Sequence, residues 1–305
     1  MGEASSDPKL LRYAAFSDHP SGGNPAGVVL DASGLDPRKQ LVVAKRVGYS
    51  ETAFLTPHPS TPAEYDIRFF SPEAEVPFCG HATVAAAVAL AERDGADQST
   101  FHLAAYSIPI TTTVDATGQI TASFTTVKPS VEDLDPGDLD EALEALRWRA
   151  EDLDDKYPPR IAYAGARHLI LAAKSRWRLS VLDYDFERLR SFMNRRDLTT
   201  VDLVFAGTDN LFDARNPFPV GGVYEDPATG AAAAALGAYL RHLGLVALPA
   251  RVSVVQGVEM GRPSLITVHV PVGEGPITVT GTAVQLTDDT TAPIASGDIN
   301  KGKAS

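Results

Sequence analysis

Residues 75–80 read Glu-Val-Pro-Phe-Cys-Gly and residues 225–230 read Glu-Asp-Pro-Ala-Thr-Gly, so the frame E-x-P-x-x-G occurs once in each half of the chain. Each copy leads into an alanine-rich stretch, residues 82–91 and 231–240, which predicts a helix. A helix start carries unpaired N–H groups at the positive end of a dipole, and glycine beside alanine leaves room for a ligand. We therefore expect a two-lobed enzyme whose substrate lies between two anion-binding helix starts.

Composition agrees with two globular lobes. The chain has 305 residues, of which 44% are hydrophobic and 22% charged, enough for two separate cores. Its 39 acidic and 27 basic side chains give a net charge of −12. Because no stripe of Lys and Arg offsets this charge, we expect no nucleic-acid partner.

Cys79 is the single cysteine, so the sequence predicts no internal disulfide, and no clustered Cys or His spacing indicates a metal site. The first residues lack the basic and apolar regions of a secretion signal. No apolar stretch approaches the roughly 20 residues of a membrane span. We expect a cytoplasmic protein that does not enter a membrane.

Strand and helix patterns alternate along the chain. Strands are predicted at residues 9–16, 26–30, 52–57, 65–70, 99–105, 108–114, 120–125, 161–173, 203–205, 252–256, 265–270 and 277–286. Further helices are predicted at residues 38–47, 139–150 and 186–194. An acidic segment, residues 129–159, places the lobe boundary near Val127, giving an N-terminal lobe of residues 1–127 and a C-terminal lobe of residues 128–287. Residues 288–305 are polar and are expected to form a frayed tail.

Two polar residues stand at the helix starts. His81 follows Gly80, where the dipole favours a neutral imidazole that can contact a bound acid or carbonyl; a purely local hydrogen-bonding role fits the position equally. Asp226 precedes Pro227, where an aspartate is often a helix cap. Since the first copy has Val76 at this place, we expect Asp226 to do more than cap a helix.

Glu51 and Cys79 are the candidates for proton transfer. Glu51 stands at the mouth of an apolar strand, and a single carboxylate among apolar neighbours suits a proton shuttle. A solvated loop acid is the simpler interpretation of the position. Cys79 lies where a helix start lowers a thiol pKa, which suits a nucleophile or an acid/base group. A small buried apolar residue explains Cys79 equally well.

Five motifs in order give the chain a family resemblance. They lie at residues 24–28 (NPAGV), 50–54 (SETAF), 68–83 (RFFSP and EVPFCGHAT), 225–230 (EDPATG) and 256–264 (QG and GRPS). With them the chain resembles, over nearly its whole length, the PhzF-like proteins of the phenazine-biosynthesis isomerase family, which share the diaminopimelate epimerase fold. The resemblance implies an α+β fold of two pseudo-symmetric lobes. Each would be a curled, mostly antiparallel sheet around a central helix, with the active site between the lobes and commonly a homodimer.

The resemblance also implies roles for individual residues. It makes Glu51 the catalytic acid/base of a cofactor-independent isomerase that shifts a proton on a small carboxylate-bearing substrate, such as a dihydro-hydroxyanthranilate. The expected substrate-binding residues are Asn24, Gly80, His81, Asp226, Gly230 and Ala231. No metal or other cofactor is implied.

Two departures from the family pattern bear on the substrate and the mechanism. Ala231 stands where the phenazine enzyme has a serine, so a hydroxyl that would meet the substrate is missing. Related epimerases use two cysteines, and here Cys79 matches one whereas Thr229 stands at the place of the other. Two alternatives therefore stay open: an epimerase-like or thiol-dependent enzyme working through Cys79, and a non-catalytic ligand-binding protein with the same fold.

Overall fold

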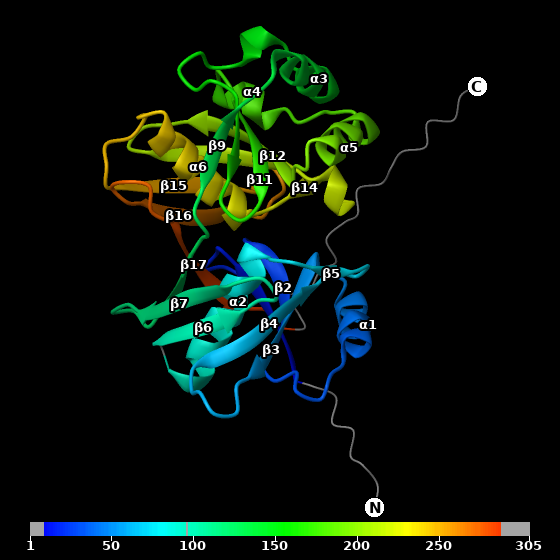
Figure 1. Cartoon of the computed structure of the whole chain (residues 1–305), viewed down its shortest axis with the longest axis vertical. Helices are drawn as coiled ribbons and strands as arrows, with labels where there is room; N and C mark the ends of the chain where they lie inside the picture. Colours follow the sequence, from blue (N-terminus) through cyan, green and yellow to red (C-terminus); the bar gives the residue numbers. More distant parts are fainter. Residues whose placement is uncertain (1–8, 96, 288–305) are drawn as a thin grey trace, which may run out of the picture.

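The computed structural model of the chain describes residues 9–95 and 97–287. Figure 1 shows two halves stacked along the long axis, each with sheet strands around a central helix. None of the helices in these residues is long and apolar enough to cross a membrane. The tail predicted at residues 288–305 lies outside the described residues.

The N-terminal half is a closed ring of strands. Its members are β1 (Leu10–Ala15), β2 (Asn24–Val29), β3 (Glu51–Pro57), β4 (Glu64–Phe70), β6 (Gln98–His102), β7 (Ser107–Val114), β8 (Ile120–Thr125) and β17 (Thr278–Gln285). Each strand pairs with the next in this order, and β17 pairs with both β8 and β1. Only the pairs β2–β3 and β4–β6 are parallel among these. The two-residue strand β5 (Glu75–Val76) pairs with β4.

The C-terminal half repeats this scheme. Its strands are β9 (Ser130–Asp133), β10 (Arg160–Tyr163), β11 (Arg167–Ala172), β12 (Thr200–Ala206), β13 (Leu211–Pro217), β15 (Ala250–Gln256) and β16 (Ser264–Val270), with β14 (Glu225–Asp226) paired to β13. They pair in that order, and β11–β12 and β13–β15 are the parallel pairs, as at the corresponding places of the first half. The predicted α+β fold of two pseudo-symmetric lobes is confirmed.

The two alanine-rich helices lie inside these sheets. They are α2 (Gly80–Asp94) and α6 (Gly230–His242). In α2 every residue from 80 to 91 is buried, so the helix has no polar face over that length, as expected for a helix enclosed on all sides. In α6 a Cβ at Gly237 would lie 2.7 Å from Val268 Cγ1, so the helix packs on β16 at a distance only glycine allows.

The remaining helices lie outside the sheets (Figure 1). They are α1 (Pro37–Val47), α3 (Pro136–Leu146), α4 (Arg176–Ser180) and α5 (Phe186–Arg195), with 3₁₀ turns at Ala150–Asp152 and Pro219–Gly221. The start of α1 is fixed by Asp36, which accepts a hydrogen bond from the N–H of Lys39. A second apolar core lies beneath α3 and α5 on the strands β10–β12.

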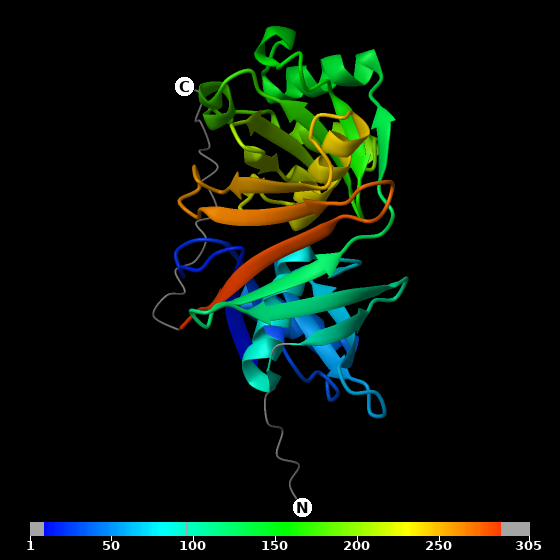
Figure 2. The same cartoon turned by 90° about the vertical axis from the view of Figure 1, so that its left-hand side faces the viewer.

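Strand β17 joins the two halves (Figure 2). Its first residues pair with β16 on one side and β8 on the other, and its last residues, 283–285, pair with β1. Phe16 is buried at the same junction: its N–H donates to the carbonyl of Thr282 at 2.7 Å, and a Cβ at Gly281 would lie 2.3 Å from the Phe16 ring. The lobe boundary near Val127 stays a prediction; the last strand of the predicted C-terminal lobe completes the N-terminal ring.

Several predicted elements differ from the observed ones. The single strand predicted at residues 161–173 is two strands, because Gly165, with φ +108°, turns the chain between them. The helix predicted at residues 139–150 begins earlier, since Asp135 caps it and Pro136 occupies the first turn. It ends at Leu146, because the next residue, Arg147, has φ +55° and leaves the helical conformation. Strands β5, β9, β13 and β14 and helix α4 were not predicted.

Candidate active site

The two helix starts meet, as the repeated frame predicts. A Cβ built on Gly80 would lie 3.6 Å from both the Cα of Gly230 and the N of Ala231. The N-cap residues are Cys79 and Thr229, and neither side chain caps its helix. Two sets of helix N–H groups and two dipoles therefore converge at one place, which favours an anion there.

The N-terminal half contributes Glu51, Cys79 and His81. Glu51 begins β3, and its Oε2 lies 3.6 Å from Cys79 Sγ and 3.5 Å from His81 Nε2. The His81 ring also contacts Cys79, with Nδ1 at 3.2 Å from the sulfur, and its Nε2 lies 3.4 Å from Ser50 Oγ. The Glu51 side chain is 14% exposed, so the carboxylate is not a solvated loop acid.

Burial sets the protonation states around Glu51. It raises the pKa of the Cys79 thiol well above its ordinary value, and the Glu51 carboxylate acts in the same direction. Burial lowers the pKa of His81, although the same carboxylate opposes that shift. At neutral pH Cys79 is therefore a thiol and His81 a neutral imidazole.

The C-terminal half contributes Asp226, which is not a helix cap. It lies in β14, ahead of the cap residue Thr229, whose hydroxyl donates to Asp226 Oδ2. Asn24, from the other half, donates from Nδ2 to Asp226 Oδ1 at 2.8 Å. Burial raises the pKa of Asp226 to about 7, with the Glu51 charge adding to the shift and the hydrogen bonds opposing it. Near neutral pH this carboxyl can hold or release a proton.

Two groups support this arrangement and were not assigned roles from the sequence. Gln256 is buried at the end of β15; its Nε2 donates to the Asp226 carbonyl at 2.7 Å and its Oε1 accepts from the N–H of Thr229 at 2.9 Å. Arg262 donates to the carbonyls of Gly22 and Gly23, next to Asn24. Both residues lie in the QG and GRPS motif of residues 256–264. That motif contributed to the family resemblance, but no role was assigned to either side chain from it.

The glutamate of the repeated frame has a structural contact in both halves. Glu75 accepts two hydrogen bonds from the guanidinium of Arg68, and Glu225 accepts two from that of Arg215. The first pair is 37% and 43% exposed, whereas the second is 8% and 4% exposed. Each pair ties the segment before a central helix to the neighbouring strand, so the repeat of glutamate is explained by anchoring.

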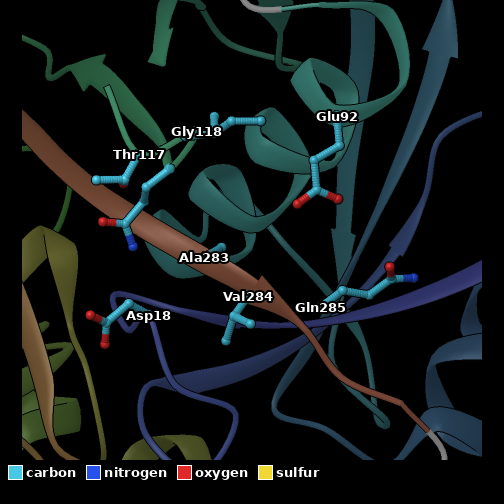
Figure 3. A pocket seen from close by; sticks show the side chains of 9 residues that line it. Asp18, Glu92, Thr117, Gly118, Ala283, Val284 and Gln285 are labelled. Atoms are coloured by element: carbon cyan, nitrogen blue, oxygen red, sulfur yellow. The ribbon is translucent and has the colours of Figure 1, made fainter. Parts of the chain in front are cut away.

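The structure thus brings all the sequence-predicted site residues to one region. They are Asn24, Glu51, Cys79, Gly80, His81, Asp226, Thr229, Gly230 and Ala231. A separate pocket of about 530 Å³ lies elsewhere, lined by Asp18, Glu92, residues 117–120 and residues 283–285 (Figure 3). Glu92 is about 18 Å from Gly80 along the axis of α2, so this pocket is not at the helix starts.

Glu51, Cys79 and His81 also offer ligand atoms within 4.8 Å of one another. A metal ion would need the thiolate of Cys79, and the raised pKa of this thiol disfavours that form. Proton transfer by Glu51 needs no such change, so the geometry suits acid/base chemistry better than metal binding.

Comparisons with known proteins agree with the fold and with the motifs. Residues 13–289 match the family model of phenazine biosynthesis-like proteins (PhzC-PhzF). A trans-2,3-dihydro-3-hydroxyanthranilate isomerase from Pseudomonas fluorescens is 32% identical over 252 residues, which are 83% of this chain and 86% of that protein. A crystal structure of a PhzF-family phenazine biosynthesis protein from Bacillus anthracis is 27% identical with a TM-score of 0.80, covering 92% of this chain and 98% of the other.

A more distant structure shows the fold alone. A hydroxyproline epimerase from Agrobacterium vitis is 14% identical with a TM-score of 0.62 and covers 91% of this chain and 90% of its own. The fold is of the diaminopimelate epimerase-like structural class, and the family model and curated relatives identify an isomerase. Within that class, the chain belongs to the PhzF family of phenazine biosynthesis-like isomerases.

Proposed function

We propose that this isomerase moves a proton on a small carboxylate-bearing molecule, with Glu51 as its acid/base group and without a cofactor. One observation carries the proposal: Glu51 Oε2 lies 3.5 Å from a buried histidine in the first turn of α2, where this helix start meets the start of α6. An anion held by the two helix starts would bring its carbon skeleton beside a single carboxylate.

The chemistry follows from the neighbours of Glu51. The carboxylate removes a proton from one carbon of the substrate, the carbon–carbon double bond shifts, and the same carboxyl returns the proton to another carbon. Neutral His81 and the partly protonated Asp226 bind polar groups of the substrate, while the helix N–H groups bind its carboxylate. The burial of these side chains excludes water, which strengthens each contact.

The proposed substrate is a small carboxylate-bearing acid of the dihydro-hydroxyanthranilate kind. The relative from Pseudomonas fluorescens, whose name states such a substrate, supports this class at 32% identity. Ala231 offers a methyl group and an N–H at the first turn of α6, where the family serine adds a hydroxyl. We therefore infer a substrate that lacks a partner for that hydroxyl. From the family resemblance alone we also propose that the enzyme is a homodimer.

The alternative that works through Cys79 is weaker on physical grounds. A nucleophilic or base-like thiol must ionise, and burial together with the Glu51 charge keeps the proton on this sulfur. The opposite face of the site offers the Thr229 hydroxyl, which is engaged with Asp226. A non-catalytic binding protein would have no need of Glu51 beside both a histidine and a second, titratable carboxyl.

The test compares Glu51→Gln with Glu73→Gln, an exposed glutamate of the same half. Both proteins are assayed for turnover of trans-2,3-dihydro-3-hydroxyanthranilate and related cyclic acids, and for ligand-induced thermal stabilisation. We expect Glu51→Gln to lose at least about 100-fold in kcat and to keep binding, because the amide cannot accept a proton. Near wild-type turnover in Glu51→Gln would remove Glu51 from the mechanism.

A further inference from the structure

A second group of titratable side chains lies on the outer face of the N-terminal half. Its members, called here the His58 cluster, are His58, Glu64, Asp66 and His102. His58 follows the last residue of β3, Glu64 and Asp66 lie on β4, and His102 ends β6. The histidines are far apart in sequence, which is why spacing alone did not connect them.

Strand register places all four side chains on one face. Asp66 is the direct partner of His102 across β4 and β6, and the N–H of His58 donates to the carbonyl of Glu64 at 3.0 Å, continuing the β3–β4 register. Directly paired residues, and residues two apart on one strand, share a face of the sheet. The intervening Ile67 is buried on the other face.

The polar atoms of the cluster converge. Glu64 Oε2 lies 3.2 Å from His102 Nε2 and 3.7 Å from His58 Nδ1, and the second ring nitrogen of His58, Nε2, lies 3.1 Å from Asp66 Oδ1. One nitrogen of each ring and one Glu64 oxygen lie within 4.8 Å of one another. Ligands at about 2.0–2.1 Å from a tetrahedral metal ion are about 3.3 Å apart, and the distances from Glu64 Oε2 to the two ring nitrogens, 3.2 Å and 3.7 Å, are close to that spacing.

Ser107 helps to hold one ring in a ligating form. It is the strand partner of His102 across β6 and β7, and its Oγ lies 2.8 Å from His102 Nδ1. When Nδ1 carries the ring proton and donates it to Ser107, Nε2 presents its lone pair toward Glu64. Histidine ligands of metal ions are commonly oriented by such a partner of the second nitrogen.

We propose that the His58 cluster binds one divalent transition-metal ion, Zn²⁺ in preference to Mg²⁺ or Ca²⁺. Two imidazole nitrogens and the Glu64 carboxylate form the mixed nitrogen and oxygen set that Zn²⁺ accepts, with water in the fourth position, whereas Mg²⁺ and Ca²⁺ take oxygen ligands. Asp66 faces the second ring nitrogen of His58, as Ser107 faces that of His102. The carboxylates of Glu64 and Asp66 balance the charge of the ion. The side chains of His58, His102 and Glu64 are 27–35% exposed, so the ion can enter from solvent.

The bound ion clips β6 to the β3–β4 hairpin and has no part in the proposed proton transfer. Glu51 and the cluster lie at opposite ends of β3, about 20 Å apart at the usual rise of a strand. The experiment on the metal site therefore does not depend on whether the proposed isomerase activity is correct.

The experiment titrates tag-free protein with ZnCl₂ by calorimetry and follows thermal unfolding with and without the ion. The variants are His58→Ala, His102→Ala and Ser107→Ala, with the exposed His242→Ala as control. We expect one Zn²⁺ per chain and a higher unfolding temperature in its presence. Loss of either cluster histidine should weaken binding at least ten-fold, Ser107→Ala should weaken it less, and His242→Ala should leave it unchanged.

CoCl₂ provides an independent readout, because a cobalt ion on a cysteine gives a thiolate charge-transfer band and one on imidazole and carboxylate does not. We expect a cobalt spectrum without that band, unchanged in Cys79→Ala. Three results would each overturn the proposal. They are a Zn²⁺ affinity no higher than that of the isolated side-chain groups in solution, unchanged Zn²⁺ binding by folded His58→Ala and His102→Ala proteins, and a thiolate band in the cobalt spectrum.

Discussion

Cys79 shows how a residue's surroundings outweigh its position in a helix. The first turn of α2 and the N–H of Ala82 lower the pKa of this thiol, whereas burial and the Glu51 carboxylate raise it. The raising effects are larger, since the sulfur is shielded from solvent and faces a negative charge at 3.6 Å. The sequence showed the helix start but could not show that Glu51 would face the sulfur.

Cys79→Ala should therefore keep most of the isomerase activity, within about ten-fold of wild type, because a protonated thiol contributes packing and little proton transfer. Steady-state kinetics of the folded variant check this expectation. Complete loss of turnover with an intact near-ultraviolet circular dichroism spectrum would instead support the thiol-dependent alternative.

Asp202 provides a residue-scale test by pH. It is buried in the C-terminal half, where its Oδ1 accepts from Asn216 Nδ2 at 3.0 Å, and burial raises its pKa to about 7. A carboxyl whose folded pKa is raised contributes stability that is present below the unfolded pKa and is lost as pH rises toward 7. His168 has the opposite effect. Burial lowers its pKa to about 3, so its contribution to the free energy of unfolding is lost as pH falls below about 6.5.

Asp202→Asn removes the first effect and leaves that of His168. We expect the free energy of unfolding of wild type, relative to the variant, to fall between pH 4 and pH 7, because over this range the Asp202 carboxyl ionises in the unfolded chain but stays protonated in the core. Urea unfolding at several pH values measures the difference. Parallel stability curves over this range would contradict a raised pKa at Asp202.

At the scale of elements, the two arginine–glutamate pairs form a natural comparison. Both join the segment before a central helix to the strand beside it, but one pair is buried and the other exposed. Arg215 also donates to the carbonyl of Ser180 at 2.7 Å, so its removal would leave a buried carboxylate and a backbone carbonyl without their partner.

Arg215→Met should lower the free energy of unfolding by about 3–5 kcal/mol, the usual effect of leaving one charge of a buried pair without its partner. Arg68→Met, the matched variant in the exposed pair, should cost about 0–1 kcal/mol. Urea denaturation of both proteins at neutral pH makes the comparison. Equal losses, or a larger loss for Arg68→Met, would mean that burial does not set the strength of these pairs.

Elements differ in how well the sequence predicts them. The helices α2 and α6 were predicted, together with their meeting, because proline, glycine and an alanine run leave few alternatives. Strand β13 was missed because Arg215 and Asn216 interrupt its apolar pattern. Partners outside the strand, among them Glu225 for Arg215 and Asp202 for Asn216, satisfy these polar groups inside the protein. Local pattern cannot report such long-range hydrogen bonds.

At the scale of the whole molecule, the site depends on contacts between the halves. Asn24 reaches Asp226, Arg262 holds the carbonyls before Asn24, and Leu265 donates to the carbonyl of Phe16 at 2.8 Å. These contacts, with β17, position Glu51 against the C-terminal half. The sequence predicted that the helix starts meet, yet the pairing of β17 with β1 depends on the closure of the whole ring, which no local signal encodes.

The measurement that tests the central claim most directly is solvent deuterium exchange. Wild type and Glu51→Gln are incubated in heavy water with trans-2,3-dihydro-3-hydroxyanthranilate and related small cyclic acids, and proton NMR follows deuterium incorporation at carbon. The account predicts incorporation into at least one acid by wild type, and incorporation slowed at least about 100-fold in Glu51→Gln while that acid still binds. Equal incorporation by the two proteins would contradict proton transfer through Glu51.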